Sequence, residues 1–296
     1  MVTAADFDRD YARRLTLDPN ELTAELSALG IGRDGVPTKA VAPGEVPEPG
    51  HLLPGVSVII PTYRGSGRIM GALMSLVDQD LDPSRFEIIV IPNGPDDGTR
   101  ALLAAFVRSQ PEPSVRVIAT APASAGGARN IGLAAARFAH VTFVDDDDQV
   151  QRSYLSSALA MATPEVIVVS PLVDVHLDGT RDANTMVTTR LSALVGRPTP
   201  LHQVPWVLGL NACKLVPTSL AKAYRFREDL ASGEDLVYFA ELLHHPQLSA
   251  VAAREGADTA YLRALRDDSI SRRALDVDFA VDQRLSCIRA LSAIDV

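Results

Sequence analysis

Short apolar runs that alternate with helical patterns dominate the chain from residue 55 onward. Each run has the length of a strand rather than of a helix. A continuous apolar run is typical of a strand buried on both faces, as in a parallel sheet. The alternation therefore predicts an α/β protein with a doubly wound, mostly parallel central sheet and helices on both faces. The runs are residues 56–60, 86–91, 115–118 and 141–144.

Helical patterns fill the intervals between these runs. Ile69, Leu73 and Leu76 share one face of the first expected helix, and Ser66 is its expected N-cap. A helix of small residues is expected before the fourth run, and an amphipathic helix near the end of the chain. The other expected helices cover about 97–108, 126–137, 233–244 and 275–293, and two further strands cover 165–170 and 172–177.

Residues 1–54 are expected to form a helical extension and a linker. Asp18, Pro19 and Glu21 have the order of a helix N-terminus with a capping box. Residues 32–54 contain five prolines among glycines, a composition typical of an extended linker.

Composition excludes several classes of protein. The chain has 296 residues, of which 47% are hydrophobic and 22% charged, as in ordinary globular proteins. Its net charge is −9 and no basic stripe is visible, which argues against a nucleic-acid partner. Cys213 and Cys287 show neither a disulfide pattern nor a metal-site spacing, so a reducing compartment is expected.

The chain shows no targeting or membrane signal. Its first residues are charged and lack the apolar stretch of a signal peptide. It contains no run of about 18 apolar residues, the length that a spanning helix needs. We therefore expect a cytoplasmic protein. The patterns leave open peripheral association with the inner face of the membrane and assembly as a homo-oligomer.

Polar segments follow the expected strands at the edge where doubly wound sheets bind ligands, beyond the strands' carboxyl ends. Residues 61–67 and 92–98 follow the first two runs, and four aspartates, residues 145–148, follow the fourth. Two unit charges about 4 Å apart repel by roughly 4 kcal/mol at an effective dielectric near 20. A divalent cation held by one or two carboxylates and a phosphate-bearing ligand would offset that repulsion. The alternative is a solvated acidic turn.

Two further segments carry groups suited to this chemistry. Gly126, Gly127 and Arg129 open the helix before the fourth strand, where a helix N-terminus and a guanidinium favour an anion. Glu234 and Asp235 open a later helix, and a carboxylate there can act as a general base. Close packing of glycines and simple stabilisation of a helix start are the alternatives.

The motifs together resemble the family-2 glycosyltransferases of GT-A fold. The resemblance rests on VSVIIPTY, EIIVIPNG, GGARNIGLAAA, VTFVDDDD and RFREDLASGEDLVYF, in that order over roughly residues 55–275. It implies an inverting transfer of a sugar from a nucleoside-diphosphate sugar to an acceptor hydroxyl, with Mn²⁺ or Mg²⁺ as cofactor. It also implies a place in cell-surface polysaccharide, glycoconjugate or glycoside biosynthesis, with a saccharide, lipid-linked or small-molecule acceptor.

The resemblance assigns roles to individual residues. Asp235 matches the catalytic base and Glu234 its usual neighbour, while Asp147 and Asp148 match metal ligands. Asp145 corresponds to the aspartate near the ribose. The segment at 266–273 resembles a late loop over the diphosphate, with Ser269, Ser271 and Arg272 as candidates. The full set expected to bind the nucleotide sugar is Pro61, Thr62, Tyr63, Asn93, Arg129, Asp145, Asp146, Ser271 and Arg272.

Two departures from the family pattern leave the identity of the base open. Pro92 stands where the family commonly has an aspartate, so base contact would come from Asn93, Asp96 or Asp97. Arg64 and the residues after it replace the usual asparagine and acidic residues.

The acceptor side carries fewer signals. Trp206, the single tryptophan, could stack on an acceptor sugar, and Asn211 is a polar residue in an apolar stretch. Core positions are the alternative for both residues. The expected division is a nucleotide-sugar-binding half over 55–150, an acceptor-binding half over 151–274 and a C-terminal helix over 275–296.

Two other functions remain open at this stage. One is a sugar-nucleotide pyrophosphorylase-like enzyme, although its glycine-rich signature would be expected after the first strand. The other is a non-catalytic module that binds a sugar nucleotide.

Overall fold

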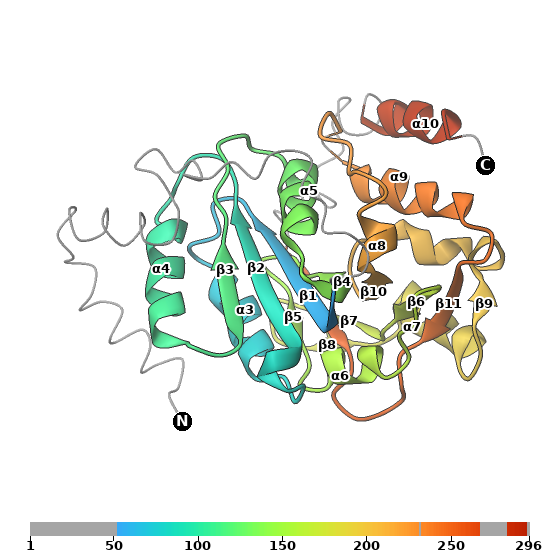
Figure 1. Ribbon diagram of the computed structural model, residues 1–296, viewed down its shortest axis with the longest axis horizontal. Coiled ribbons are helices and arrows are strands. Elements are labelled where there is room, and N and C mark those ends of the chain that lie inside the picture. The colour runs from blue at the N-terminus through green and yellow to red at the C-terminus, as the bar shows by residue number, and fades with distance from the viewer. Residues whose placement is uncertain (1–51, 231, 267–282, 295–296) are drawn as a thin grey trace.

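One eight-stranded sheet crosses the molecule (Figure 1), in a computed structural model that describes residues 52–230, 232–266 and 283–294. Its strand order is β3-β2-β1-β4-β10-β6-β11-β9, and four of the seven strand pairs are parallel. The predicted α/β sheet is confirmed. The strands are β1 (Leu53–Thr62), β2 (Phe86–Pro92), β3 (Ser114–Val117), β4 (Phe138–Phe143), β6 (Val166–Val169), β9 (Thr199–Pro200), β10 (Lys214–Pro217) and β11 (Ser249–Ala252).

Helices lie on both faces of the sheet, as expected. Ile88 and Val90 of β2 join the main core, whereas Ile89 and Ile91 pack in a separate cluster with Ala128. This alternation is the period of two expected of a strand buried on both faces. The helices are α3 (Ile69–Val77), α4 (Thr99–Ser109), α5 (Ala125–Ala135), α6 (Tyr154–Leu159), α7 (Met186–Arg190), α8 (Thr218–Ala221), α9 (Glu234–Glu241) and α10 (Arg284–Ser292).

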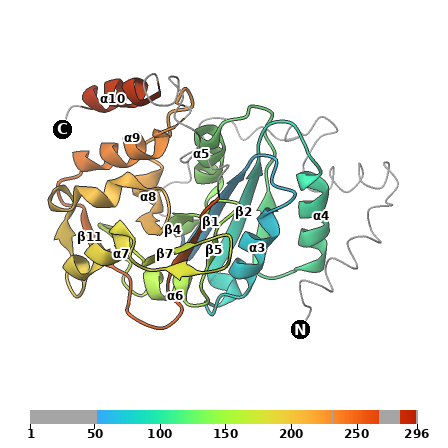
Figure 2. The ribbon, with the colours of Figure 1, turned by 180° about the vertical axis from the view of Figure 1, so that it is seen from behind.

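Helices α4, α9 and α10 lie at the two ends of the sheet. In Figure 1 α4 lies beside β3, and in both views α9 and α10 lie together beyond the opposite half of the sheet (Figures 1 and 2). No helix in the described ranges is both long enough and apolar enough to cross a membrane.

Strand β10 is one of the strands that the sequence analysis missed; the others are β9, β11 and three strands of a second sheet. It runs antiparallel to both of its neighbours, β4 and β6. Leu215 pairs with Thr142, and Val216 with Val141. The amino-terminal end of β10 therefore lies beside the carboxyl end of β4, where the aspartates begin.

A second sheet supports the same edge. Its order is β5-β12-β7-β8, and β5 directly follows the four aspartates. The carboxyl end of β4 is therefore held between the two sheets. These strands are β5 (Gln149–Val150), β7 (Leu172–Val175), β8 (Arg181–Asp182) and β12 (Tyr261–Ala264).

Short 3₁₀ helices complete the connections and account for much of the loop-rich stretch. They are η2 (Pro83–Arg85), η3 (Leu191–Leu194), η4 (Leu201–Gln203), η5 (Pro205–Gly209) and η6 (Leu242–His244).

One local prediction was wrong, and several lie outside the described residues. Ser66 does not cap α3, because the N-cap position is Arg68 and no side chain caps that helix. Ser66 instead donates its hydroxyl to Asp97 at 2.9 Å. Residues 1–51 lie outside the described ranges, as do 275–282 of the expected last helix. The expected domain boundaries stay a prediction, and the main sheet takes strands from both expected halves.

Candidate active site

The four consecutive aspartates after β4 turn toward different partners. Asp146 is buried and accepts hydrogen bonds from Thr62 Oγ1 at 2.5 Å and Arg68 Nε at 2.8 Å. Arg68 also donates to the carbonyl of Tyr63 at 2.6 Å. A Cβ on Gly65 would lie 2.0 Å from Thr62 Oγ1, so this turn requires glycine. Asp146 therefore fixes the loop that follows β1.

Asp148 ties the acidic segment to the second sheet. It is buried, and its two oxygens accept hydrogen bonds from the Tyr261 hydroxyl at 2.7 Å and the Ala264 amide at 2.8 Å. The same hydroxyl accepts a hydrogen bond from the Asp145 amide at 3.1 Å. Burial, together with the charges of Asp145 and Asp147, raises the pKa of Asp148 well above its usual value.

Asp145 and Asp147 face cations rather than neutral donors. Asp145 accepts from Arg129 Nη2 at 3.2 Å and keeps 40% of its side chain exposed. Asp147 pairs with Arg266 Nη2 at 2.9 Å. Burial and repulsion from Asp145 raise the pKa of Asp147, although Arg266 opposes the shift. These carboxylates are the ones placed to take up positive charge.

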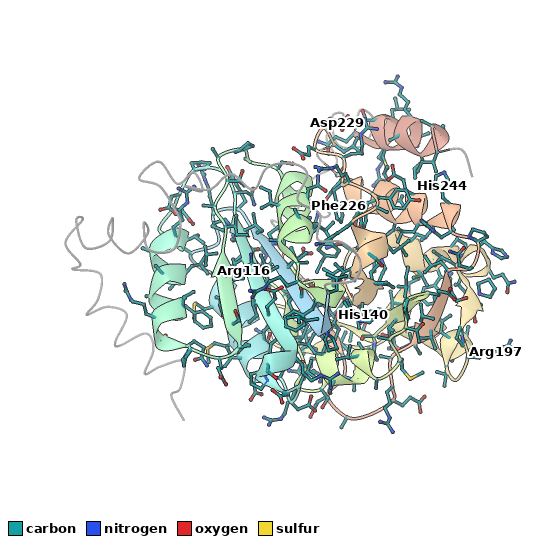
Figure 3. The ribbon with its side chains drawn as sticks, viewed as in Figure 1. Arg116, His140, Arg197, Phe226, Asp229 and His244 are labelled. Carbon is teal, nitrogen blue, oxygen red and sulfur yellow. The ribbon has the colours of Figure 1, made fainter. Side chains whose placement is uncertain are left out.

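Arg129 joins this acidic segment to the start of α9. Its guanidinium is buried and donates to Glu234 Oε1 at 2.6 Å as well as to Asp145. It also lies 5.5 Å from the ring centroid of Phe226, which Figure 3 labels near α5. Asp145, Glu234 and Asp235 raise the pKa of Arg129 despite its burial. One buried cation thus links carboxylates that lie far apart in the sequence.

The glycine-rich start of α5 allows this approach. Ser124 is the N-cap and accepts the Gly127 amide at 3.0 Å. A Cβ on Gly126 would lie 2.8 Å from the carbonyl oxygen of Arg227. The prediction that Arg129 lies on a glycine-rich helix start is confirmed by this geometry.

Helix α9 begins at Glu234, as predicted. Its N-cap is Gly233 at φ 78°, in the left-handed region that favours glycine. Burial raises the pKa of Glu234, and Arg129 opposes that shift. Asp235 is partly exposed, and its carboxylate accepts a hydrogen bond from the Leu236 amide at 2.8 Å. Asp235 is therefore an accessible carboxylate at the margin of the buried ion-pair network.

The nucleotide-side candidates line the ends of β1 and β2. Pro61 is buried within β1, and Asn93 donates from Nδ2 to the carbonyl of Thr62 at 2.9 Å. Tyr63 is 42% exposed, with the Arg64 guanidinium 5.5 Å from its ring centroid. An exposed ring beside a positive charge at this edge suits a nucleobase or a diphosphate.

Asp97 anchors the next loop instead of standing free. It accepts hydrogen bonds from Ser66 and from the hydroxyl of Thr99. These bonds lower its pKa to about 2, against the raising effect of burial. The loops after β1 and β2 are thereby joined.

The acceptor-side candidates lie next to α9. Trp206 is half-buried in η5, which packs against α9. Asn211 is 5% exposed, and neither Oδ1 nor Nδ2 has a hydrogen-bond partner in the described structure. Ser269, Ser271 and Arg272 lie outside the described residues, so their assignment stays a prediction.

Three residues near this edge escaped the sequence analysis: Arg68, Lys214 and Tyr261. Arg266 lies at the start of the expected late loop at 266–273 but was not named as a candidate. Lys214 could have been noticed, because it interrupts an apolar run in a chain with only three lysines. Arg68 and Tyr261 gave no signal in the sequence, because their partners Asp146 and Asp148 lie at distant positions.

The donor set fits a hard divalent cation. Asp145 and Asp147 offer carboxylate oxygens, the ligands that Mg²⁺ and Mn²⁺ prefer. Within the described ranges, no three or more His, Cys, Asp and Glu side chains form a ready-made metal cage. This arrangement agrees with a cation held by one or two carboxylates and completed by ligand oxygens.

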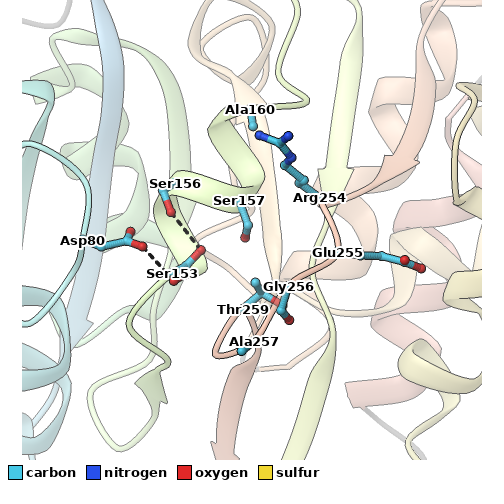
Figure 4. Close-up of a pocket in the computed structure, with 10 residues that line it drawn as sticks. All are labelled: Asp80, Ser153, Ser156, Ser157, Ala160, Arg254, Glu255, Gly256, Ala257 and Thr259. Carbon is cyan, nitrogen blue, oxygen red and sulfur yellow. Dashed lines mark hydrogen bonds between the residues drawn. The ribbon is translucent and has the colours of Figure 1, made fainter.

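A cavity of about 340 Å³ lies away from this edge, between α6 and residues 254–259 (Figure 4). Ser153 and Arg254 line it, and Ser153 donates to Asp80 at 2.7 Å. None of the predicted site residues lines it. The acidic edge, rather than this cavity, carries the candidate chemistry.

Solved structures share this fold. The chain aligns with Staphylococcus aureus TarS in complex with UDP at TM-score 0.60 and 19% identity, over 82% of this chain and 67% of that one. It aligns equally well, at TM-score 0.60 and 19% identity, with the Pyrobaculum calidifontis mannosyltransferase PcManGT in complex with GDP-Man and Mn²⁺, over 84% and 68%. The fold is therefore the GT-A fold of glycosyltransferases.

Sequence comparison is more specific. Residues 57–211, more than half of the chain, match the family described as Glycosyl transferase family 2. The chain belongs to that family.

Curated relatives agree with this assignment. The S. aureus poly(ribitol-phosphate) beta-N-acetylglucosaminyltransferase TarS is 27% identical over 62% of this chain and 31% of its own length. The Rhizobium meliloti succinoglycan biosynthesis protein ExoO is 29% identical over 74% and 63%. The chain thus spans less than two thirds of either relative.

Proposed function

We propose that this protein is an inverting, metal-dependent glycosyltransferase that moves a sugar from a nucleoside-diphosphate sugar to an acceptor hydroxyl. One observation carries the proposal: Arg129 holds Asp145, at the acidic edge, and Glu234, beside Asp235, in one buried network. The network puts an acidic edge suited to a cation and a candidate general base on the same site.

The acidic edge would hold the diphosphate of the donor through a cation. Asp147 and Asp145 are the carboxylates that would bind Mn²⁺ or Mg²⁺. In Asp146 and in Asp148, each of the two carboxylate oxygens already accepts one hydrogen bond. The family resemblance gave Asp148 as a metal ligand and Asp145 as a residue near the ribose. We propose instead that Asp148 holds the segment in place and that Asp145 binds the cation with Asp147. When bound, the cation would supply Lewis-acid stabilisation of the diphosphate leaving group.

The ends of β1 and β2 would hold the nucleoside. Tyr63 presents an exposed ring, and Asn93 and Thr62 hold the two strand ends together. The structures of relatives with UDP and GDP-Man support a nucleotide-sugar donor as the ligand class.

Asp235 would act as the general base. It is ionisable, partly exposed and at a helix start, where the helix dipole favours a carboxylate. In this role it takes the proton of the acceptor hydroxyl, whose oxygen then attacks the anomeric carbon opposite the leaving diphosphate. A single displacement of this kind inverts the anomeric configuration.

Trp206 and Asn211 would line the acceptor side, because η5 packs against α9 and Asn211 follows η5 closely. The names of TarS and ExoO support a role in cell-surface polysaccharide or related glycoconjugate synthesis.

A thermal-shift panel of UDP-, GDP- and dTDP-sugars, each with and without Mn²⁺, tests the donor assignment. We expect one nucleotide class to raise the melting temperature only when Mn²⁺ is present, since a ligand stabilises the state that it binds. Release of nucleoside diphosphate from that donor would then support catalysis over a binding module. Exchange of labelled pyrophosphate into the donor would instead indicate a pyrophosphorylase and contradict the proposal.

A further inference from the structure

Lys214 is a buried cation that the proposed reaction has not yet used. Its side chain is 2% exposed, and Nζ has no hydrogen-bond partner in the described part of the chain. Buried ammonium groups are costly unless they are paired, so a position that serves packing alone is normally filled by an apolar side chain. The retention of an ammonium here calls for a second reason.

The position of Lys214 relates it to the start of α9. Its Nζ lies 3.6 Å from the ring centroid of Phe239, a cation–π contact. Asp235 precedes Phe239 by four residues on α9, so the two side chains share one helix face. Helical side chains lean toward the N-terminus, which directs the Phe239 ring toward the turn that carries Asp235. The ammonium thus lies on the buried side of the helix face that presents Asp235.

Few other charges act on Lys214. On β10 its neighbour is the Cys213 thiol, and burial raises the pKa of that thiol to about 11, so it is neutral at pH 7. On β6 the paired residue is the apolar Val169. On α9 the neighbouring Glu234 is already bound to Arg129. Asp235 is therefore the carboxylate of α9 whose charge acts on Lys214.

We propose that Lys214 is a positioning residue for the reaction, a buried ammonium on the inner side of α9 whose charge orients the Asp235 carboxylate. This inference rests on the proposed function, in which Asp235 is the general base. The two carboxylates at the start of α9 then have separate cations. Arg129 binds Glu234 by direct contact, and Lys214 acts on Asp235 through space.

The charge of Lys214 changes within a pH range in which activity can be measured. Burial lowers its pKa from 10.5 to about 8, although Cys213 and Asp235 oppose that shift. Lys214 therefore carries its proton at pH 7 and loses it as the pH rises through about 8. Asp235 then faces a neutral amine instead of an ammonium ion.

Donor hydrolysis in the presence of Mn²⁺, with water as acceptor, tests this role without knowledge of the natural acceptor. We compare the wild type with Lys214→Met, which keeps the shape of the side chain, and Lys214→Arg, which keeps its charge. Lys222→Met is the matched control, because Lys222 is half-buried and donates instead to the Ala136 carbonyl, at the end of α5, at 2.9 Å.

We expect Lys214→Met to lower kcat about tenfold or more, because the charge that orients the Asp235 carboxylate is lost and a misplaced catalytic group reacts more slowly. Nucleoside-diphosphate affinity should stay within about twofold of wild type, since the nucleotide is assigned to other strands. The wild-type rate should fall as the pH rises through about 8, whereas Lys214→Arg should keep activity and lose that alkaline decline. A Lys214→Met protein with the wild-type kcat and the same alkaline decline would overturn the assignment.

A double-mutant cycle of unfolding gives a readout that needs no turnover. Asp235→Asn, Lys214→Met and the double variant are unfolded by denaturant at pH 7. We expect Asp235→Asn to destabilise the wild type more than it destabilises Lys214→Met, because only the wild type retains the buried ammonium. Additive effects would refute the coupling. A wild type that binds no nucleotide sugar, with the coupling intact, would count against the proposed function and leave the Lys214–Asp235 pair standing.

Discussion

At the scale of single residues, chemically identical neighbours have different environments. Asp146 and Asp148 are buried and accept neutral or positive donors from flanking elements, whereas Asp145 stays partly open. The residue type indicated an acidic site. The partners decide which carboxylates can receive a cation and which ones hold the segment in place.

The role of Asp235 leads to the sharpest prediction at this scale. Asp235→Asn keeps the shape of the side chain but removes its capacity to accept a proton. We expect kcat for donor hydrolysis or transfer to fall by about 10²–10⁴-fold, the usual contribution of a general base. Calorimetry should show nucleoside-diphosphate affinity within about twofold of wild type. Asp78→Asn, a change at an exposed surface ion pair, is the control, and near-normal turnover by Asp235→Asn would refute the role.

The burial of Lys214 leads to a prediction about stability. Its pKa falls from 10.5 when unfolded to about 8 when folded, so the unfolded chain binds more protons between these values. The free energy of unfolding should therefore rise with pH from about 8 to 10.5, because folding no longer buries a charge. Below pH 8, burial of the charged Lys214 side chain lowers the free energy of unfolding by roughly 3 kcal/mol. The cation–π contact with Phe239 offsets part of this loss.

Lys214→Met should remove both the cost of burying the charge and the rise in the free energy of unfolding between pH 8 and 10.5. We expect urea denaturation at pH 7 to show a free energy of unfolding roughly 1–2 kcal/mol above wild type, because a buried charge is replaced by an apolar chain of similar shape. Higher stability with lower turnover is the signature of a residue kept for function. A loss of stability above about 1 kcal/mol at pH 7 would instead indicate a structural role.

At the scale of elements, the site depends on how closely α5 approaches β1. Gly132 faces Ile59, and a Cβ there would lie 2.4 Å from Ile59 Cγ2. Ile59 is fully buried in the sheet and has little room to move. The glycine therefore sets the distance between helix and strand, and with it the position of Arg129 on the same helix.

Gly132→Ala should push α5 away from the sheet. We expect a loss of about 1–3 kcal/mol in the free energy of unfolding, because overpacking outweighs the better helix propensity of alanine. Chemical denaturation measures the change. Gly67→Ala is the control, because nothing lies within 4 Å of the added Cβ, and it should stay within about 0.5 kcal/mol of wild type. Equal stability of the two variants would contradict this account of the packing.

The direction of strand β10 in the sheet decides where its residues lie. Its sequence is a short apolar run with one lysine. Inserted antiparallel between β4 and β6, it brings its amino-terminal end to the edge that parallel strands reach with their carboxyl ends. Lys214 reaches the acidic edge only because of this reversed direction.

At the scale of the whole molecule, the sheet and the ion-pair network join parts that are distant in the chain. Arg129 and Glu234 are 105 positions apart in the sequence, yet Arg129 Nη1 lies 2.6 Å from Glu234 Oε1. Asp147, Asp148 and Glu234 all have raised pKa values, each mainly through burial. These three carboxyl groups are therefore less easily ionised in the folded protein than in the unfolded chain.

The raised pKa values of these carboxyl groups predict how the free energy of unfolding depends on pH. A raised folded pKa means that the folded state binds more protons than the unfolded one above the ordinary carboxylate values of 3.8 and 4.5. The contribution of these groups to the free energy of unfolding is thus full at acidic pH and is lost as the pH rises through the raised values.

Thermal unfolding at a series of pH values measures this dependence. Without metal, the melting temperature should decline with rising pH over that range. Asp148→Asn should reduce the decline, and Mn²⁺ with nucleoside diphosphate should oppose it by binding the ionised carboxylates. The exposed change Asp178→Asn serves as the control. A decline that neither the variant nor the ligands alter would contradict the account.

The sequence by itself determined the parallel part of the sheet formed by β1 to β4, the edge where ligands bind and the residue types of the site. Apolar runs of strand length and helical spacing follow local periodicity, which needs no knowledge of the fold. Polar segments after strands predict where ligands bind, and the starts of α5 and α9 were expected near their observed positions. The family motifs added roles that periodicity alone could not supply.

Only the tertiary structure decided which of these residues meet. The split of the aspartates between Arg129, Arg266 and Tyr261, the reversed β10 and the burial of Lys214 depend on contacts between distant segments. Such contacts form when strands pair and helices pack, and charge energies depend on burial, which the fold as a whole sets. The sequence therefore indicates the chemistry of the site, whereas packing determines which side chains can perform it.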